Sequence, residues 1–384
     1  MPLDRPSIIP RAIFLACSWT WCIGMFLPVY LIGDFGVWGW VAFAVPNVIG
    51  AALMGTVLRT PGASEAMIHR HTPAMRWFSI VTVLFHLYFL AAFFQPQAPV
   101  VGMGLAAIAL CAGLVIAAHR PRDRWIAAPV IYAASIACVV LAKLTDPAAL
   151  MWIDRTPEHT LADLAMAAPV MVFGFGLCPY LDLTFHRVRR ETPGRAGPVA
   201  FWVGFVIFFT PMIALTPFYS GSFSEWIICH IFLQSAFTIG VHVRELIDIG
   251  VLERPAVVGR PSSRRYAATA AILLTLVALV VGAGLAVNHS DWQRPGYGTL
   301  RRLGYELFMS FYALVFPAYV WIVVIERGMT RATRLTTYAA ALALASPCMW
   351  LGYIQQHYVW LLPGVAIPVL LPLIVARFAG SRRS

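Results

Sequence analysis

Charged residues are scarce in this sequence. Only 12% of the 384 residues are Asp, Glu, Lys or Arg, whereas 60% are hydrophobic, and the mean hydropathy is +0.76. A soluble protein usually has about a quarter of its residues charged, because its surface must stay hydrated. The composition therefore excludes an ordinary soluble protein and predicts a multi-pass membrane protein embedded in a lipid bilayer.

Cysteine pairs and familiar catalytic motifs are also missing. All seven cysteines lie in apolar segments and none belongs to a Cys-x-x-Cys pair, which argues against a disulfide framework or a zinc site. No Gly-x-Ser-x-Gly, His-Glu-x-x-His or P-loop motif occurs. We therefore expect neither an enzyme nor a cofactor, although an intramembrane enzyme built on His86, His230 and Asp182 remains an alternative.

The sequence does contain a series of long apolar segments. A helix needs about 20 residues to cross the hydrocarbon core of a bilayer. Twelve segments of about this length are present: 11–31, 36–58, 75–94, 99–118, 125–144, 163–185, 199–219, 224–246, 266–287, 304–325, 335–354 and 358–376. The fold class predicted is an all-α polytopic membrane protein with about 12 transmembrane helices, forming a single domain over residues 1–384.

Basic residues are distributed unevenly between the two sides of these segments. With the N-terminus placed inside, the inner connections and termini hold 23 of the 28 Lys and Arg residues. Cytoplasmic loops carry such an excess. The pattern predicts a protein of the cell (inner) membrane with both termini cytoplasmic. The net charge of +11 would then lie mostly on the cytoplasmic face, next to anionic lipid, so no nucleic-acid partner is expected. The same distribution leaves no Lys or Arg for the membrane core.

Glycine and proline interrupt the first and sixth segments. Non-helical backbone at membrane depth is tolerated only where it is buried in protein or lines a cavity. Interruptions at corresponding places of two halves are typical of inverted-repeat transporters. The residues concerned are Ser18–Trp21, Gly24 and Pro28 in the first segment, and Gly174, Gly176 and Pro179 in the sixth. We predict an inverted repeat of five plus five helices (about 11–144 and 163–325) and two extra C-terminal helices (about 335–376).

The first two segments resemble the solute:sodium symporter family. The matching residues, a Ser–Trp pair, a glycine turn and a Pro-Asn before a glycine, are Ser18, Trp19, Trp21, Gly33, Gly36, Trp40, Pro46, Asn47 and Gly50. The segment 59–78 is similar to the family's inner loop. The resemblance implies an inverted-repeat fold and sodium-coupled uptake of a small solute. The family's extra first helix and longer C-terminal part have no counterpart here.

The eighth segment carries a polar stripe. His230, Gln234, Thr238 and His242 recur every four residues and so share one helix face, with Ser235 beside them. The resemblance implies an ion site made of this helix and the first, at Cys17, Thr20, Ser235 and Thr238. The family's adjacent hydroxyl pair is missing, so the coupling ion expected is either Na⁺ or H⁺, and the stripe serves either a site or helix packing.

The predicted solute site lies between the two interruptions, with the third, eighth and tenth segments as its walls. The candidate substrate-binding residues are Trp19, Trp21, Gly24, His86, Gly174, Gly176, Tyr180, Asp182, Gln234 and Tyr312. A substrate carboxylate would meet the N-termini of half-helices, because no buried Arg is expected. Asp182 either stabilises a helix that begins at Pro179 or binds a substrate cation or a proton.

The function that the sequence predicts is secondary active transport of a small organic solute by alternating access. The alternative is a transport-like membrane sensor or scaffold that binds a solute without moving it. The sequence specifies no protein partner.

Overall fold

The computed structural model describes residues 8–93, 99–118, 124–145, 156–218, 224–252, 275–286, 299–325 and 328–380. Within these ranges the chain is helical and has no β-strand. Among the described residues, ten helices are long and apolar enough to span a membrane, and the bent pair α1–α2 gives an eleventh if it is taken as one span. A further apolar helix, Thr275–Ala286, is shorter, and the rest of the predicted ninth segment lies outside the described residues. The all-α membrane architecture is thus confirmed.

The first repeat predicted from the sequence contains six helices. Their bounds are α1 (Ile8–Trp19), α2 (Cys22–Phe35), α3 (Val37–Val57), α4 (Pro61–Phe93), α5 (Pro99–Ala118) and α6 (Arg124–Thr145). The pair α1–α2 is the first span, and α3 to α6 are the second to fifth. Each span agrees with its predicted segment, except that α4 begins 14 residues earlier and is kinked at His71.

The second half is more irregular. Its elements up to the eighth span are α7 (Leu161–Leu177), η2 (Cys178–Leu181), α8 (Leu183–Glu191), α9 (Ala196–Trp202), η3 (Val203–Phe209), α10 (Thr210–Ala214), η4 (Thr216–Phe218) and α11 (Glu225–Leu252). The later ones are α13 (Thr299–Ser310), η5 (Phe311–Val315), α14 (Phe316–Tyr319), η6 (Val320–Val324), α15 (Arg331–Met349), η7 (Trp350–Ile354), η8 (Tyr358–Trp360) and α16 (Leu361–Gly380). The wide π-helical turn η5 precedes Pro317, whose missing N–H interrupts the regular ladder.

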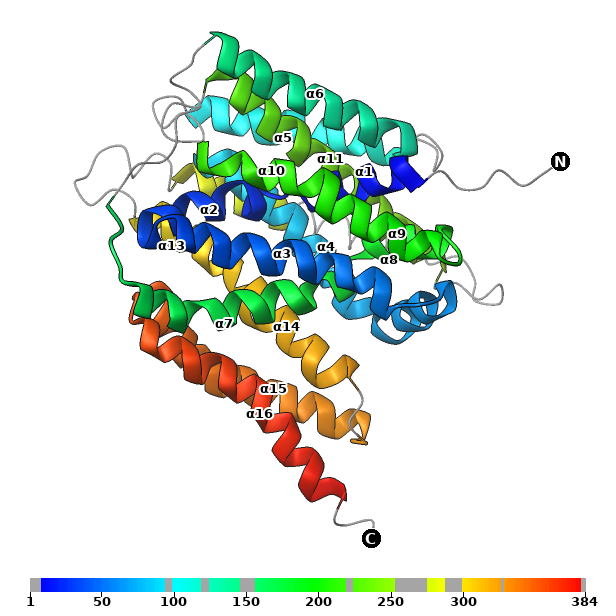
Figure 1. Cartoon of the computed structure of the whole chain (residues 1–384), viewed down its shortest axis with the longest axis vertical. Coiled ribbons are helices and arrows are strands. Elements are labelled where there is room, and N and C mark those ends of the chain that lie inside the picture. The colour runs from blue at the N-terminus through cyan, green and yellow to red at the C-terminus, as the bar shows by residue number, and fades with distance from the viewer. Residues whose placement is uncertain are drawn as a thin grey trace, which may run out of the picture.

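The helix α11 is central to the packing. It contacts α1, α4, α5, α6 and α8, whereas α15 and α16 pack on each other and reach the body through α7 and η6. Figure 1 shows α15 and α16 along one side of the molecule and α5 and α6 along the opposite side.

Both predicted interruptions are present, and each includes only some of the residues predicted for it. The first lies at Thr20 and Trp21, and Gly24 and Pro28 are inside the continuous helix α2. The second lies after Leu177, so that Gly174 and Gly176 belong to α7. A proline within a helix removes one hydrogen bond without necessarily ending the helix, and here packing against other helices decides where the ladder breaks.

Two glycines allow the interrupted spans to approach their neighbours closely. A Cβ added to Gly50 of α3 would overlap the backbone of Phe175 in α7, and one added to Gly204 of η3 would lie 2.8 Å from the carbonyl oxygen of Ala12 in α1. Small residues at crossings let membrane helices pack backbone to backbone. The second span is therefore fitted against the sixth, and the seventh against the first.

Candidate functional site

The first span is broken between α1 and α2, whose axes are bent by 56°. Trp21 takes an extended conformation (φ −90°, ψ 167°), so the helical hydrogen-bond ladder stops there. Neighbouring helices add hydrogen bonds to carbonyls on either side of the break. Thr238 Oγ1 donates to the Cys17 carbonyl (3.4 Å), and the Tyr305 hydroxyl donates to the Cys22 carbonyl (3.2 Å). The buried break is thereby tied to α11 and α13, as backbone at membrane depth requires.

The sixth span is broken between α7 and α8. After the 3₁₀ turn η2, Asp182 adopts an extended conformation and becomes the N-cap of α8. Its Oδ1 accepts hydrogen bonds from the N–H and the hydroxyl of Thr184, both at 2.7 Å. The prediction that α8 begins at Pro179 is wrong, because Pro179 lies in η2. Asp182 precedes the helix, where a carboxylate can reach the N–H two residues on.

The two breaks lie against each other. Thr184 Oγ1 at the start of α8 lies 3.2 Å from Ser18 Oγ near the end of α1, and both side chains are buried. The Trp19 ring packs on Phe185 with centroids 5.0 Å apart, and its indole N–H donates to Asn47 Oδ1 (2.6 Å). The interrupted spans therefore meet in the interior of the protein.

His86 joins the third span to the start of α2. Its Nδ1 lies 2.8 Å from the carbonyl oxygen of Thr82, which only accepts hydrogen bonds, so Nδ1 carries the hydrogen. The other nitrogen, Nε2, then accepts the N–H of Cys22 at 3.4 Å. This arrangement requires a neutral imidazole with both nitrogens engaged, which makes His86 an N-terminal cap for α2 supplied by another helix.

The indole of Trp21 packs among the three spans that the sequence predicted as walls. Its ring centroid lies 5.4 Å from Phe78 of α4, 5.6 Å from His242 of α11 and 5.5 Å from Tyr312 of η5. Its indole N–H donates to the Ser18 carbonyl. Trp21 thus contacts the third, eighth and tenth spans at the level of the breaks.

The polar stripe of α11 points into the protein interior. All five of its members are wholly buried: His230, Gln234, Ser235, Thr238 and His242. Several polar atoms here have no hydrogen-bond partner within the described ranges: Gln234 Oε1, Ser235 Oγ, His242 Nε2 and Asp182 Oδ2. Buried polar atoms are nearly always paired in proteins. Such a concentration of unpaired atoms near the breaks is the chemical signature expected of a binding site.

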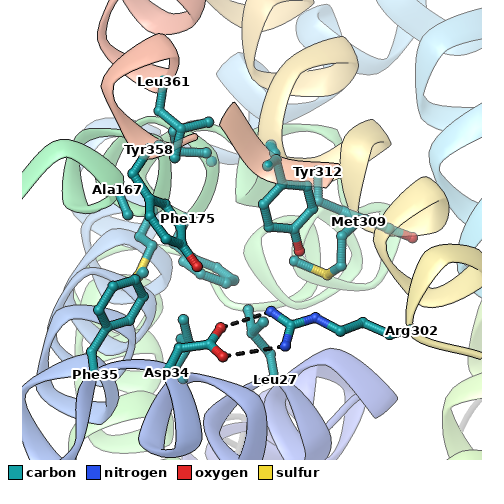
Figure 2. Close-up of a pocket in the computed structure, with 16 residues that line it drawn as sticks. Leu27, Asp34, Phe35, Ala167, Phe175, Arg302, Met309, Tyr312, Tyr358 and Leu361 are labelled. Atoms are coloured by element: carbon teal, nitrogen blue, oxygen red, sulfur yellow. Dashed lines mark hydrogen bonds and ion pairs between the residues drawn. The ribbon is translucent and has the colours of Figure 1, made fainter. Parts of the chain in front are cut away.

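A cavity lies beside this polar centre. The space open to the centres of water-sized molecules is about 60 Å³, and the cavity is bounded by α2, α7, α13, η5 and the C-terminal elements η7, η8 and α16. Figure 2 shows Arg302 reaching toward both oxygens of Asp34 along one edge, with Tyr312 and Phe175 among the side chains of the walls. Most of the lining is apolar, so the cavity suits a solute with an apolar body.

Arg302 bears on the expectation that a substrate carboxylate would meet no buried Arg. It is the first residue of the candidate span Arg302–Val324 and it lines the cavity. Its guanidinium donates to the two oxygens of Asp34 (3.2 and 2.8 Å) and to Glu306 Oε1 (2.7 Å). Two carboxylates thus offset the cost of its burial. A solute carboxylate in this cavity would therefore find an arginine nearby.

The opposite end of the broken spans is also fixed by charged side chains. Arg187 of α8 bonds to Glu245 of α11 at 2.9 Å through two nitrogens, and it contacts Asp248 and Glu191. Burial alone would lower the pKa of Arg187, but these three carboxylates outweigh burial and raise that pKa. The neighbouring Arg189, also contrary to expectation, is fully buried and donates to backbone carbonyls at the end of α3.

The predicted site residues do not all come together. Of the predicted substrate-binding set, Gly174 and Tyr312 line the cavity. Those gathered around the two breaks instead are Trp19, Trp21, His86, Asp182 and Gln234, while Gly24 and Gly176 are inside helices and Tyr180 lies in η2. Of the predicted ion ligands, the Cys17 carbonyl meets Thr238, the Thr20 hydroxyl bonds to the Ala16 carbonyl, and Ser235 Oγ is unpaired within the described ranges.

Sequence reasoning missed the pair formed by Asp34 and Arg302. The two residues are 268 positions apart, and the sequence placed each of them in or next to an outer loop. One local signal was available, because Glu306 follows Arg302 by four residues, the spacing of a helical ion pair. No local pattern indicates the contact with Asp34.

No family model matches this chain, and no curated protein matches it. Among solved structures, the fold is similar to the one described as "Inward facing conformation of Mhp1". That alignment covers 98% of this chain and 91% of that chain, with 15% sequence identity and a TM-score of 0.43. The chain's own residues must therefore carry its functional assignment.

Proposed function

We propose that this protein is a secondary active transporter that moves a small organic solute across the cell membrane by alternating access. The observation that carries the proposal is the meeting of two interrupted spans at a buried polar centre, through Ser18 and Thr184. Broken helices at the first and sixth positions place helix ends and non-helical backbone at membrane depth, where a solute can bind. A structural membrane protein has no need for such expensive features.

The pattern of helix packing supports an inverted repeat of five plus five spans. In such a repeat, span n corresponds to span n + 5. Two spans that pack together should therefore have corresponding spans that also pack together. The first span packs on the seventh, fifth and eighth, and correspondingly the sixth packs on the second, tenth and third. Likewise the fifth packs on the eighth and the tenth on the third. This correspondence supports two halves of equivalent architecture, with α15 and α16 as additions.

The cavity supports a solute with an apolar body and at least one charged or polar group. Its walls come from α2, α7 and η5, which adjoin the two breaks, and the Asp34–Arg302 pair lies on its edge. Since Arg302 also holds Glu306, a solute carboxylate would compete with two protein carboxylates for the same guanidinium. Binding would then loosen the link between α2 and α13, which is one route by which a solute drives a conformational change.

Uptake into proteoliposomes tests the proposal. Purified full-length protein would be reconstituted and assayed with a panel of radiolabelled amino acids, organic acids, nucleobases and polyols, under sodium gradients, pH gradients and no gradient. We expect concentrative uptake of at least one class. A solute that binds, as judged by thermal stabilisation, but is neither taken up nor exchanged would favour the sensor or scaffold alternative. No binding and no uptake across the panel would contradict both.

A further inference from the structure

Two buried ionisable side chains face each other beside the breaks. Asp182 is tied through Oδ1 to Thr184, and His242 is tied through Nδ1 to Ser79 Oγ at 3.1 Å. The remaining atoms, Asp182 Oδ2 and His242 Nε2, have no hydrogen-bond partner within the described ranges and lie 4.0 Å from each other. Each side chain is thus fixed on one side and unsatisfied on the side that faces the other.

A single proton would satisfy both atoms. In the neutral tautomer whose Nδ1–H donates to Ser79 Oγ, the bare Nε2 faces the buried carboxylate oxygen and no hydrogen bond joins them. The other tautomer, whose Nε2–H could donate to the carboxylate, would need no added proton, and proton counting separates the two. With the added proton, an N–H···O or O–H···N hydrogen bond can form once the atoms approach to about 3 Å. The same proton cannot serve a second acceptor here, because the other atom of each group is already engaged. The geometry therefore has room for one shared proton.

None of the surrounding ionisable groups that the structure describes places a positive charge next to the Asp182 carboxylate. On α4, His86 is held neutral by two hydrogen bonds, and on η5 the Tyr312 hydroxyl bonds to Thr82 (2.9 Å). On α11, Glu245 is the nearby acid and is paired with Arg187 of α8. The thiol groups of Cys178 in η2 and Cys22 in α2 complete the set. None of these groups supplies a cation directly to Asp182.

We propose that Asp182 Oδ2 and His242 Nε2 form a proton-binding site. The pair joins α8, the half-helix after the second break, to α11. Proton binding would draw the two helices together by about 1 Å, and proton release would part them. Because Thr184 links α8 to Ser18 of α1, that movement reaches the first break as well. The role of this proton as the coupling ion rests on the proposed transport function, whereas its binding does not.

Proton counting on the purified full-length protein tests the binding. Acid–base titration in detergent would compare wild type with Asp182→Asn, His242→Gln and the double variant between about pH 5 and 8. Asparagine retains the capping geometry, so the first variant should fold. We expect each single variant to bind one proton fewer than wild type. The double variant should lose the same single proton, because the proton is shared.

The controls separate the alternatives. His230→Gln removes a buried histidine of the same helix, whose Nδ1 contacts Ser135, and should leave the count unchanged. Replacing sodium by choline should also leave it unchanged, and a count that falls in sodium would identify a metal-ion site instead. Loss of two protons in the double variant, or no loss in either single variant, would overturn the proposal.

Transport measurements distinguish this inference from the proposed function. In proteoliposomes, a pH gradient should drive uptake of a transported solute in wild type but not in Asp182→Asn. A correct proton count without uptake of any solute would leave the proton site standing and remove the transport function. Solute uptake that is independent of the pH gradient, together with an unaltered proton count in the variants, would support the transport function and remove the proton site.

Discussion

Breaking the ion pair between Asp34 and Arg302 should loosen the contact between α2 and α13. The perturbations are Asp34→Asn, Arg302→Met and the double variant, which together form a thermodynamic cycle. The pair is well suited to this test, because the two terminal guanidinium nitrogens of Arg302 contact separate oxygens of Asp34. Both side chains are mostly buried, with 24% of Arg302 and 6% of Asp34 exposed.

The expected magnitudes follow from this geometry. Two unit charges about 4 Å apart attract by about 4 kcal/mol at an effective dielectric constant of about 20, and desolvation reduces the net value. We expect a coupling energy of about 2–3 kcal/mol between the two positions. Arg302→Met should be the more damaging single change, at about 3–5 kcal/mol, because it leaves both Asp34 and Glu306 buried without their cation.

Two measurements would follow the change. Unfolding of the purified protein in mixed micelles gives the free energies of the four proteins. Thiol labelling of Leu31→Cys, which lies in the cavity lining, reports access to the cavity. Labelling should accelerate in each variant background relative to the intact pair.

The reasoning would be refuted by a coupling energy below about 0.5 kcal/mol, the value of an exposed surface pair. It would also fail if Asp34→Asn proved more destabilising than Arg302→Met. An unchanged labelling rate would indicate that the pair contributes stability without controlling access.

Three further changes test other contacts. His86→Leu should destabilise the protein by about 1–2 kcal/mol in thermal unfolding, because the Cys22 N–H loses its acceptor, and His86→Gln should recover part of the loss; equal losses would argue against the cap. Gly50→Ala should lower the free energy of unfolding by about 1–3 kcal/mol or abolish folding. Gly62→Ala, whose added Cβ would meet no atom within 4 Å, should be neutral or stabilising. Arg187→Gln should cost about 3 kcal/mol or more. Because the pKa of this arginine is raised above its ordinary 12.5, its stabilisation is present at every lower pH where its carboxylates are ionised, so losses measured at about pH 6 and 9 should agree.

Local patterns in the sequence located the spans and the polar face of α11. The burial of Gln234 and Thr238 followed from their four-residue spacing, which is a property of a single helix. The presence of interruptions in the first and sixth spans was likewise visible in Gly and Pro.

Which of the predicted residues form the breaks was not predictable in the same way. Pro28 fits inside α2, whereas the ladder stops at Trp21, where His86 and Thr238 from other spans supply hydrogen bonds. Such partners depend on the assembled bundle, and the same holds for Asp34 and Arg302. The positions of the breaks and the ion pair depend on contacts between residues far apart in the sequence and not on helix propensity. Such contacts cannot be read from a single sequence.

The cap that His86 provides for α2 has a consequence for hydrogen exchange. The Cys22 amide is bonded to a side chain of α4, whereas most helical amides are bonded within their own helix. Fraying of α2 alone would not expose this N–H, but separation of α2 from α4 would. The rate of deuterium uptake at this single amide would therefore report how often the two helices separate, in the unmodified protein and without any attached label.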